Sequence, residues 1–468
     1  MSHCNARPNA IGGRVWISAA LLCACGSTDV IADVARRDGD AATSGDGATM
    51  DPASLAAWCR GEAALRTVTA DGRAALECAT RLAARSFGHA VCACDTITGQ
   101  GVLSTSGFEV GGSQSRAAGA AVGINAASGE AATLPALFVG GSVTLAGQAP
   151  VMLAAASQTV AGDLRSRASL WPSSAQTQLR VERDAWLPAS SALDPARLSV
   201  GGDLHLAPAA ADAQQADRWS TAAVAGETRR ADLTLAPPCP CDDHQRLDVA
   251  AMVAWAETHN DNAQLPFAAS ALSSPAGPTT RELPCGRYHF PAIDGPGRLT
   301  LRIDQPVALF VGDLLSWIEI ELGPAGSLDL FVAGTFEPRG GRLGSRDRPA
   351  ATRVYVHDQP AADPVEMIGE LVSNFYGPNV RAQTFNALRH GSMLVRELLV
   401  PDTLTVNYDR SIADPGVCGA RAGEACRGCG ECADGQACLS GRCTSCRSDA
   451  DCCTPLVCGN GRCEALLL

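Results

Sequence analysis

The feature that most constrains the fold is a repeat of about 20 residues in the first half of the chain. Four short β-prone segments each place a valine just before a turn, at nearly even spacing along the chain: Val139, Val160, Val181 and Val200. A unit of strand, turn and strand cannot bury its apolar face alone, so such units are expected to stack into a β-solenoid. Val122 precedes Val139 by a somewhat shorter interval and is interpreted as an irregular first coil.

A similar spacing of β-prone segments recurs in the second half of the chain. Its β-prone segments include Phe310-Val311-Gly312-Asp313-Leu314, Phe331-Val332-Ala333-Gly334, Val354-Tyr355-Val356 and Met393-Leu394-Val395. Alternation in 299–303 and 328–332 places aliphatic residues inward at every second position. Glycines are expected at corners that need positive φ. A β-sandwich with evenly spaced strands is the competing interpretation. The repeat favours a mainly β fold, a β-solenoid with a small helical segment and a disulfide-rich C-terminal module.

Two parts of the chain are predicted to be helical. In 51–92, Asp51-Pro52 provides a helix start, and Leu55, Trp58 and Leu65 lie near helical spacing, with a second helix at about 71–86. We expect Cys59 and Cys78 to join these two helices as a hairpin. A further helix is predicted at about 245–259, ending near Asn260.

The N-terminal residues have the layout of an export signal. Arg7 and Arg14 precede the apolar run 15–21, which is too short to span a bilayer. The following Leu22-Cys23-Ala24-Cys25 resembles the bacterial lipobox, which implies cleavage before Cys25 and acylation of its thiol. Gly26 and Ser27, which are not acidic, then imply the outer membrane. Ordinary signal cleavage that leaves Cys25 as a thiol is the alternative.

Composition divides the chain further. The segment that follows Cys25 is rich in Gly, Ala, Asp and Ser, a composition that suits a flexible tether. The predicted parts are a signal peptide (1–24), a linker from the lipidated cysteine (25–55), a small helical cysteine-containing segment (56–98), a first solenoid part (99–235), a CxC motif, helix and second solenoid part (236–414), and a cysteine-rich module (415–468).

Charge and residue usage exclude several function classes. The net charge of −12 opposes binding to a nucleic-acid backbone. No lysine occurs, which excludes Schiff-base lysines and the P-loop lysine. No Gly-x-Ser-x-Gly segment supports a nucleophilic triad. We predict no catalytic residues and no cofactor.

Eighteen cysteines remain once Cys4, Cys23 and Cys25 are set aside. In an oxidising extracytoplasmic space they are predicted to form disulfides. Seven lie in the body and eleven in the tail, so full pairing requires at least one bridge between the two. The candidates are Cys59, Cys78, Cys92, Cys94, Cys239, Cys241, Cys285, Cys418, Cys426, Cys429, Cys432, Cys438, Cys443, Cys446, Cys452, Cys453, Cys458 and Cys463.

Two alternatives for specific chemistry are weaker. Cys239, Cys241, His244 and Cys285 could form a zinc site, but export favours disulfides, and mutual bridging of the CxC segments 92–94 and 239–241 is one arrangement. We therefore predict no metal. Corner carboxylates could serve as an acid and base pair on a polysaccharide, although aspartates in such positions are more often turn residues: Asp163, Asp203 and Asp313.

Two resemblances to known families follow from longer stretches. In 236–412, the order and spacing of Cys239-Pro240-Cys241-Asp242, Pro284-Cys285-Gly286-Arg287-Tyr288, Leu328-Asp329-Leu330-Phe331-Val332 and Asn374-Phe375-Tyr376-Gly377-Pro378 resemble a family of bacterial extracytoplasmic lipoproteins and pilus-associated proteins of uncharacterised function. This implies a β-helical fold and an envelope location. The part from Cys446 to Cys463 resembles knottin-like and Dickkopf-like modules, with a zinc ribbon at Cys426, Cys429 and Cys432 as the rival.

These observations lead to one functional expectation. We expect a non-enzymatic, lipid-anchored protein of the cell envelope with a structural or adhesive role, held to the membrane by its lipid and meeting an envelope polysaccharide or a surface protein. A carbohydrate-active enzyme on the same scaffold and a protein associated with pilus assembly are the alternatives.

Overall fold

The computed structural model describes most of the body and parts of the tail. The described residues are 52–61, 63–108, 119–126, 132–207, 218–273, 276–338, 340–357, 364–413, 436–440, 442–448, 451–452, 456–459 and 462–465. The predicted signal peptide, Cys25 and most of the linker lie outside them. Within them, no helix is both long and apolar enough to cross a bilayer.

The body is a β-solenoid of about 12 turns, which confirms the predicted fold class and excludes the β-sandwich. The strands β7 (Ala136–Val139), β10 (Ser157–Val160), β13 (Gln178–Val181) and β15 (Leu198–Val200) pair in parallel. Their register stacks the four valines of the repeat directly on one another: Val139, Val160, Val181 and Val200. All four are buried, so the column forms part of the interior.

The interpretation of Val122 as a first coil beneath Val139 was wrong. Val122 lies in β5 (Val122–Ile124), which pairs with β8 (Val143–Leu145), so its partner in the next coil is Val143. Each coil has more than one strand, and Val122 belongs to the strand that follows the turn. Val122 and Val139 therefore belong to two different columns of stacked residues, which explains the short interval between them.

In the second half of the chain, aromatic residues stack along the solenoid axis. Strands β22 (Pro306–Leu314), β24 (Ser327–Val332) and β25 (Thr352–Val356) place Phe310, Phe331 and Tyr355 in register. Their ring centroids are 4.9 and 4.7 Å apart and nearly parallel. β20 (Gly286–Ile293) continues this sheet, and β19 (Thr279–Leu283), β21 (Arg298–Ile303) and β23 (Trp317–Leu322) form another face.

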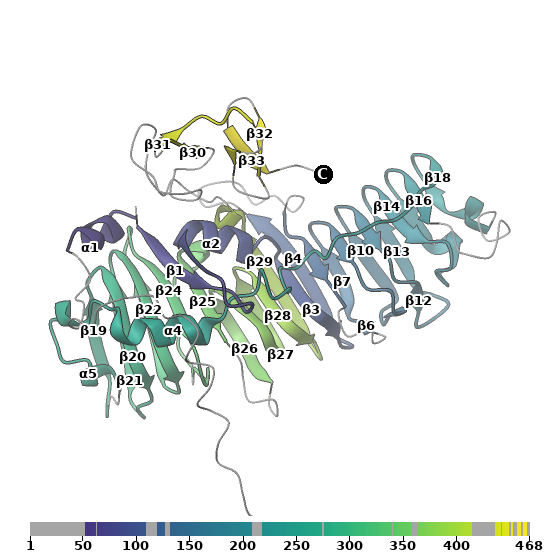
Figure 1. The fold of residues 1–468 in the computed structure, drawn as a ribbon. Coiled ribbons are helices and arrows are strands. Elements are labelled where there is room, and N and C mark those ends of the chain that lie inside the picture. The colour runs from purple at the N-terminus through teal and green to yellow at the C-terminus, as the bar shows by residue number, and fades with distance from the viewer. Residues whose placement is uncertain are drawn as a thin grey trace, which may run out of the picture. The chain divides into compact units, whose positions relative to one another are not determined.

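The two predicted solenoid parts form one continuous stack, but not in chain order. β28 (Met393–Leu399) pairs in parallel with β3 (Val91–Thr98), and β29 (Thr403–Asp409) pairs with β4 (Val102–Phe108). The last coil of the second half therefore lies on the first coil of the first half. Figure 1 shows purple β3 and β4 between green β28 and β29 on one side and the blue strands on the other. This pairing covers two strand edges that would otherwise be open.

Two helices are present in 51–92, as predicted, but they are shorter than predicted and strands occupy the residues between them. Between α1 (Pro52–Cys59) and α2 (Ala79–Ser86), the strands β1 (Ala64–Val68) and β2 (Ala74–Cys78) form an antiparallel hairpin. Its turn contains Asp71-Gly72, with Gly72 at φ +82° and the Asp71 carboxylate accepting the Thr69 hydroxyl at 2.6 Å. The Asp-Gly pair is a strong hairpin signal that the helical spacing obscured. The segment 56–98 also contains the first solenoid strand, β3.

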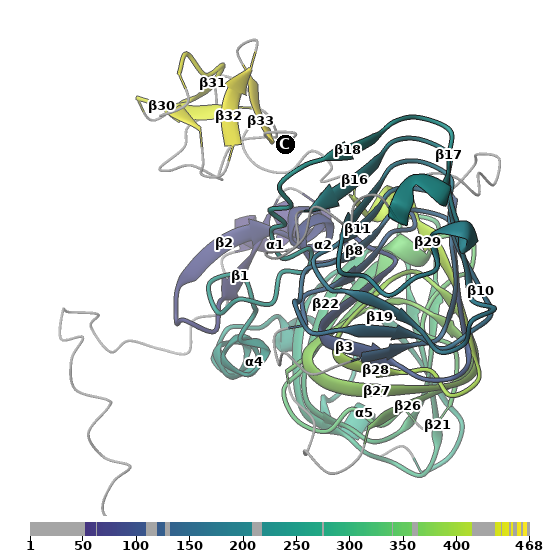
Figure 2. The ribbon, with the colours of Figure 1, turned by 90° about the vertical axis from the view of Figure 1, so that its right-hand side faces the viewer.

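The predicted helix of the second half is present as α4 (Val249–Thr258). The Asp248 carboxylate accepts the Ala251 N–H at 2.9 Å and caps its start, and the Asn260 amide donates to the carbonyls of Ala256 and Glu257 at its end. Figure 2, which views the stack of coils end-on, shows α2 and α4 outside the stack on the same flank. α4 contacts β1, β20, β22 and β24.

Candidate functional site

Three disulfides fasten distant parts of the body together. Cys92 bonds Cys239 and Cys94 bonds Cys241, each pair with a sequence separation of 147 and a Cα–Cα distance of 5.7 Å. Two disulfides therefore join the two CxC segments to each other, which is one of the predicted arrangements. The connection joins β3 in the middle of the stack to the segment that leads from the first solenoid part into α4.

The predicted Cys59–Cys78 bridge was wrong. Cys59, at the end of α1, bonds Cys285, just before β20, with a Cα–Cα distance of 5.5 Å. The helical hairpin that would have brought Cys59 to Cys78 does not exist, and α1 instead contacts β20. Cys78 is disulfide-bonded as well. Its partner lies outside the body, because the other six body cysteines pair with one another.

The cysteine-rich tail is described in part. Cys446 bonds Cys458 and Cys452 bonds Cys463, in a segment that contains the hairpins β30–β31 (Ala437–Leu439, Arg442–Thr444) and β32–β33 (Leu456–Gly459, Arg462–Ala465). Cys438 and Cys443 are disulfide-bonded too. The other tail candidates lie outside the described residues: Cys418, Cys426, Cys429, Cys432 and Cys453.

Disulfides occupy the thiols of the body cluster that was considered as a zinc site and of a second cysteine cluster in the tail, whereas the zinc-ribbon candidates Cys426, Cys429 and Cys432 lie outside the described residues. Cys239, Cys241 and Cys285 are all bonded, so they offer no thiolate beside the exposed His244. In the tail, the sulfurs of Cys446, Cys452 and Cys463 lie within 4.8 Å of one another. Their two disulfides explain this closeness without a metal ion.

The corner carboxylates accept backbone hydrogen bonds from the next coil. The Asp184 carboxylate accepts the N–H of Asp203 at 2.8 Å, the Asp203 carboxylate accepts the N–H of Glu227 at 2.9 Å, and Asp313 accepts the N–H of Thr335 at 2.7 Å. One coil earlier in this column, the Asp163 N–H donates to the Ser142 hydroxyl at 3.0 Å, and the Asp163 carboxylate pairs with Arg165. Asp163 and Asp203 lie outside the strands, at turns as predicted, whereas Asp313 lies within β22; all three join coils to one another.

The corner glycines have a different purpose from the predicted one. Gly162, Gly202 and Gly226 are not in the positive-φ region. A Cβ on Gly202 would lie 2.0 Å from the Asp184 carboxylate, and one on Gly226 would lie 2.2 Å from the Asp203 carboxylate. These glycines are needed because the preceding coil approaches too closely for a side chain. The expectation of positive φ was wrong at these corners.

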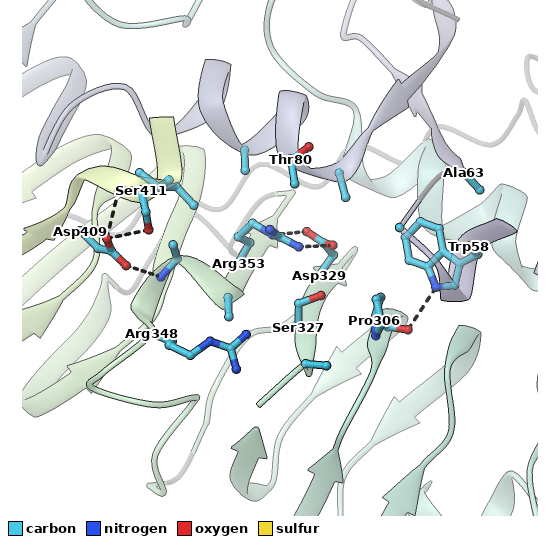
Figure 3. A pocket seen from close by; sticks show the side chains of 17 residues that line it. Trp58, Ala63, Thr80, Pro306, Ser327, Asp329, Arg348, Arg353, Asp409 and Ser411 are labelled. Carbon is cyan, nitrogen blue, oxygen red and sulfur yellow. Dashed lines mark hydrogen bonds and ion pairs between the residues drawn. The ribbon is translucent and has the colours of Figure 1, made fainter. Parts of the chain in front are cut away.

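A cavity of the body lies on the flank covered by α1 and α2. Its volume is about 440 Å³, within the range of small-molecule sites. Figure 3 shows side chains from α1, α2, the β24–β25 region and the turn after β29 around it. The charged lining residues are Asp329, Arg348, Arg353 and Asp409.

A buried ion pair forms one wall of this cavity. Arg353 donates from Nε and Nη2 to the two carboxylate oxygens of Asp329, at 2.6 and 2.7 Å, and their side chains are 7% and 2% exposed. Burial opposes the charge of Arg353, but Asp329 more than compensates, so the pKa of Arg353 lies above its usual value. The two residues are direct partners in the register of β24 and β25.

Asp409 is the second buried carboxylate of the cavity. One oxygen accepts the N–H and the hydroxyl of Ser411, at 3.1 and 2.7 Å, and the other accepts the N–H of Ala350 at 3.2 Å. Groups of the chain itself therefore hold both Asp329 and Asp409 in place within the cavity.

This cavity was not predicted from the sequence. The signal was present, since aligning Leu328-Asp329-Leu330 with Thr352-Arg353-Val354 as neighbouring coils places Asp329 beside Arg353. A charged residue in each of two buried strands indicates an ion pair. The contributions of α1, α2 and the turn after β29 have no such signal, because they depend on how helices pack on the stack.

No family model, no curated protein and no solved structure matches the chain.

Proposed function

We propose that this protein is a lipid-anchored component of the bacterial cell envelope with a structural or adhesive role and no enzymatic activity. The observation that carries the proposal is the pair of parallel disulfides Cys92–Cys239 and Cys94–Cys241. Structural disulfides form and persist in oxidising extracytoplasmic spaces. They fit the export signal and lipobox-like Leu22-Cys23-Ala24-Cys25 at the start of the sequence.

A structural or adhesive role is supported by the construction of the body. Each coil buries its apolar side chains against its neighbours, and corner hydrogen bonds and disulfides add connections along and across the stack. Each carboxylate oxygen of the cavity residues Asp329 and Asp409 accepts a hydrogen bond from the chain. Such a body is suited to holding a shape and presenting a surface.

The anchor is tested by labelling cells with a palmitate analogue. The wild-type chain is expected to take up the label, and Cys25→Ala is expected to lose it. Cys23→Ala is the matched control, because it changes the neighbouring cysteine and keeps the residue that would be acylated. Equal labelling of wild type and Cys25→Ala would contradict the anchor.

The partner is sought by affinity capture from intact envelopes. The baits are the unchanged full chain and a chain that ends at residue 414 and carries Cys78→Ser, so that the shortened chain has no unpaired Cys78. A partner found with the first bait and lost with the second would assign the recognition role to the cysteine-rich module. Equal recovery with both baits would assign that role to the body.

A further inference from the structure

Arg353 has donors left over after its ion pair. A guanidinium carries five N–H groups, and the pair with Asp329 uses one on Nε and one on Nη2. The three others have no hydrogen-bond partner among the residues that the structure describes. Arg353 lines the cavity, so an acceptor bound there would meet the remaining donors of this otherwise buried side chain.

The charges around the cavity cancel. Asp329 and Asp409 contribute two negative charges, and Arg348 and Arg353 contribute two positive ones. Arg348 is held by the carbonyls of Gly323 and Gly326, at 2.8 and 3.0 Å. An anion drawn to Arg353 would also meet the carboxylates, and a cation would meet the arginines. The electrostatics therefore favour a neutral ligand with hydrogen-bonding groups.

The rest of the lining alternates hydroxyl groups with small apolar surfaces. Ser327, Ser411 and Thr80 face the cavity among alanine side chains from α2 and the β25 region. Trp58 closes one end, its indole fixed by a hydrogen bond from Nε1 to the Pro306 carbonyl at 3.2 Å. A sugar ring likewise presents hydroxyl groups beside C–H surfaces, so it is complementary to a lining of this kind.

We propose that this cavity binds a neutral hexose unit, the end or a branch of a saccharide, with Arg353 donating to its ring or hydroxyl oxygens. The proposal gives the adhesive role a ligand class and rests on the proposed function for its setting. The cavity's volume of about 440 Å³ leaves room for a monosaccharide and part of the next unit.

Calorimetric titration of the purified full chain, in a detergent without a sugar headgroup, tests the proposal. The probes are three matched pairs: glucose with glucuronic acid, galactose with galacturonic acid, and mannose with mannuronic acid. We expect saturable binding of at least one hexose and at least tenfold weaker binding of its uronic acid, which differs only in having a carboxylate in place of the C6 hydroxymethyl group. No binding of any of the hexoses, or equal binding of the acid, would overturn the proposal.

Two variants locate the site. Ser327→Leu fills part of the cavity and is expected to weaken hexose binding at least tenfold, whereas Ser199→Leu makes the same change on an exposed strand position and should leave it unchanged. The double variant Asp329→Leu/Arg353→Met removes the donors without leaving a lone buried charge, and is also expected to abolish binding. Binding that survives both changes would contradict the assignment. Palmitate labelling is independent of this result, so a failed anchor and a failed sugar site are distinguishable.

Discussion

Cys92 and Cys239 have a sequence separation of 147, yet a disulfide joins them, and Cys94 and Cys241 repeat the connection two positions further on. The second bridge closes only a short loop once the first exists. Loop-closure entropy gives about 2 kcal/mol for the loss of either bridge and about 7 kcal/mol for the loss of both. We expect guanidinium unfolding of Cys92→Ser/Cys239→Ser and Cys94→Ser/Cys241→Ser to show small losses, and of the quadruple variant a much larger one. Additive losses would contradict this account.

The pairing of Cys78 gives a second prediction. Its partner lies outside the body, and the tail contains an odd number of cysteines, so we expect Cys78 to bond a cysteine of 415–468. Peptide mapping by mass spectrometry without reduction should recover a cross-linked peptide pair from β2 and the tail. Recovery of Cys78 joined to Cys4, Cys23 or Cys25 would contradict the prediction.

The coil repeat was predictable from sequence, but the stacking order was not. The column of Val139, Val160, Val181 and Val200 follows from a spacing that a local pattern records. The joint between β28 and β3 pairs residues such as Met393 and Val91, which lie in opposite parts of the sequence. Parallel pairing between such distant strands has no turn and no fixed spacing to mark it. For the same reason the odd cysteine count predicted a bridge leaving the body but not its partner.

Close approach at a corner is tested by a double-mutant cycle. Gly202→Ala would place a Cβ 2.0 Å from the Asp184 carboxylate, and overpacking of this kind costs about 1 to 3 kcal/mol. Asp184→Ala removes that oxygen and the hydrogen bond to Asp203 N–H, at a cost of about 1 kcal/mol. We expect the two losses in unfolding free energy to sum to more than that of the double variant. Strict additivity would mean that Asp184 is not the obstacle.

The buried pair of the cavity gives a matched stability prediction. Arg353→Met leaves Asp329 charged and without its partner, which costs about 3 to 5 kcal/mol. The double variant Asp329→Leu/Arg353→Met leaves no buried charge behind and is expected to recover most of that loss. Chemical denaturation measures both. A double variant no more stable than Arg353→Met would show that the pair itself, rather than the lone carboxylate, determines the difference.

All four tyrosines of the chain resist ionisation in the folded state. They are buried, and burial raises the pKa of Tyr288, Tyr355 and Tyr408 above the usual 10 and that of Tyr376 to about 12. The Tyr376 hydroxyl also accepts the Leu247 N–H at 2.9 Å. We therefore expect no tyrosinate absorbance near pH 10 while the chain is folded.

The same shifts make the fold sensitive to alkali. Above pH 10 the unfolded tyrosines lose protons that the folded ones keep, so the unfolded state binds fewer protons and the unfolding free energy falls as pH rises. Tyr376 contributes a loss of roughly 3 kcal/mol between pH 10 and about 12. Tyr376→Phe is expected to start from a lower stability at neutral pH, because Leu247 N–H loses its acceptor, and to show a shallower fall between pH 10 and 12. Parallel pH curves for wild type and Tyr376→Phe would contradict the raised pKa of Tyr376.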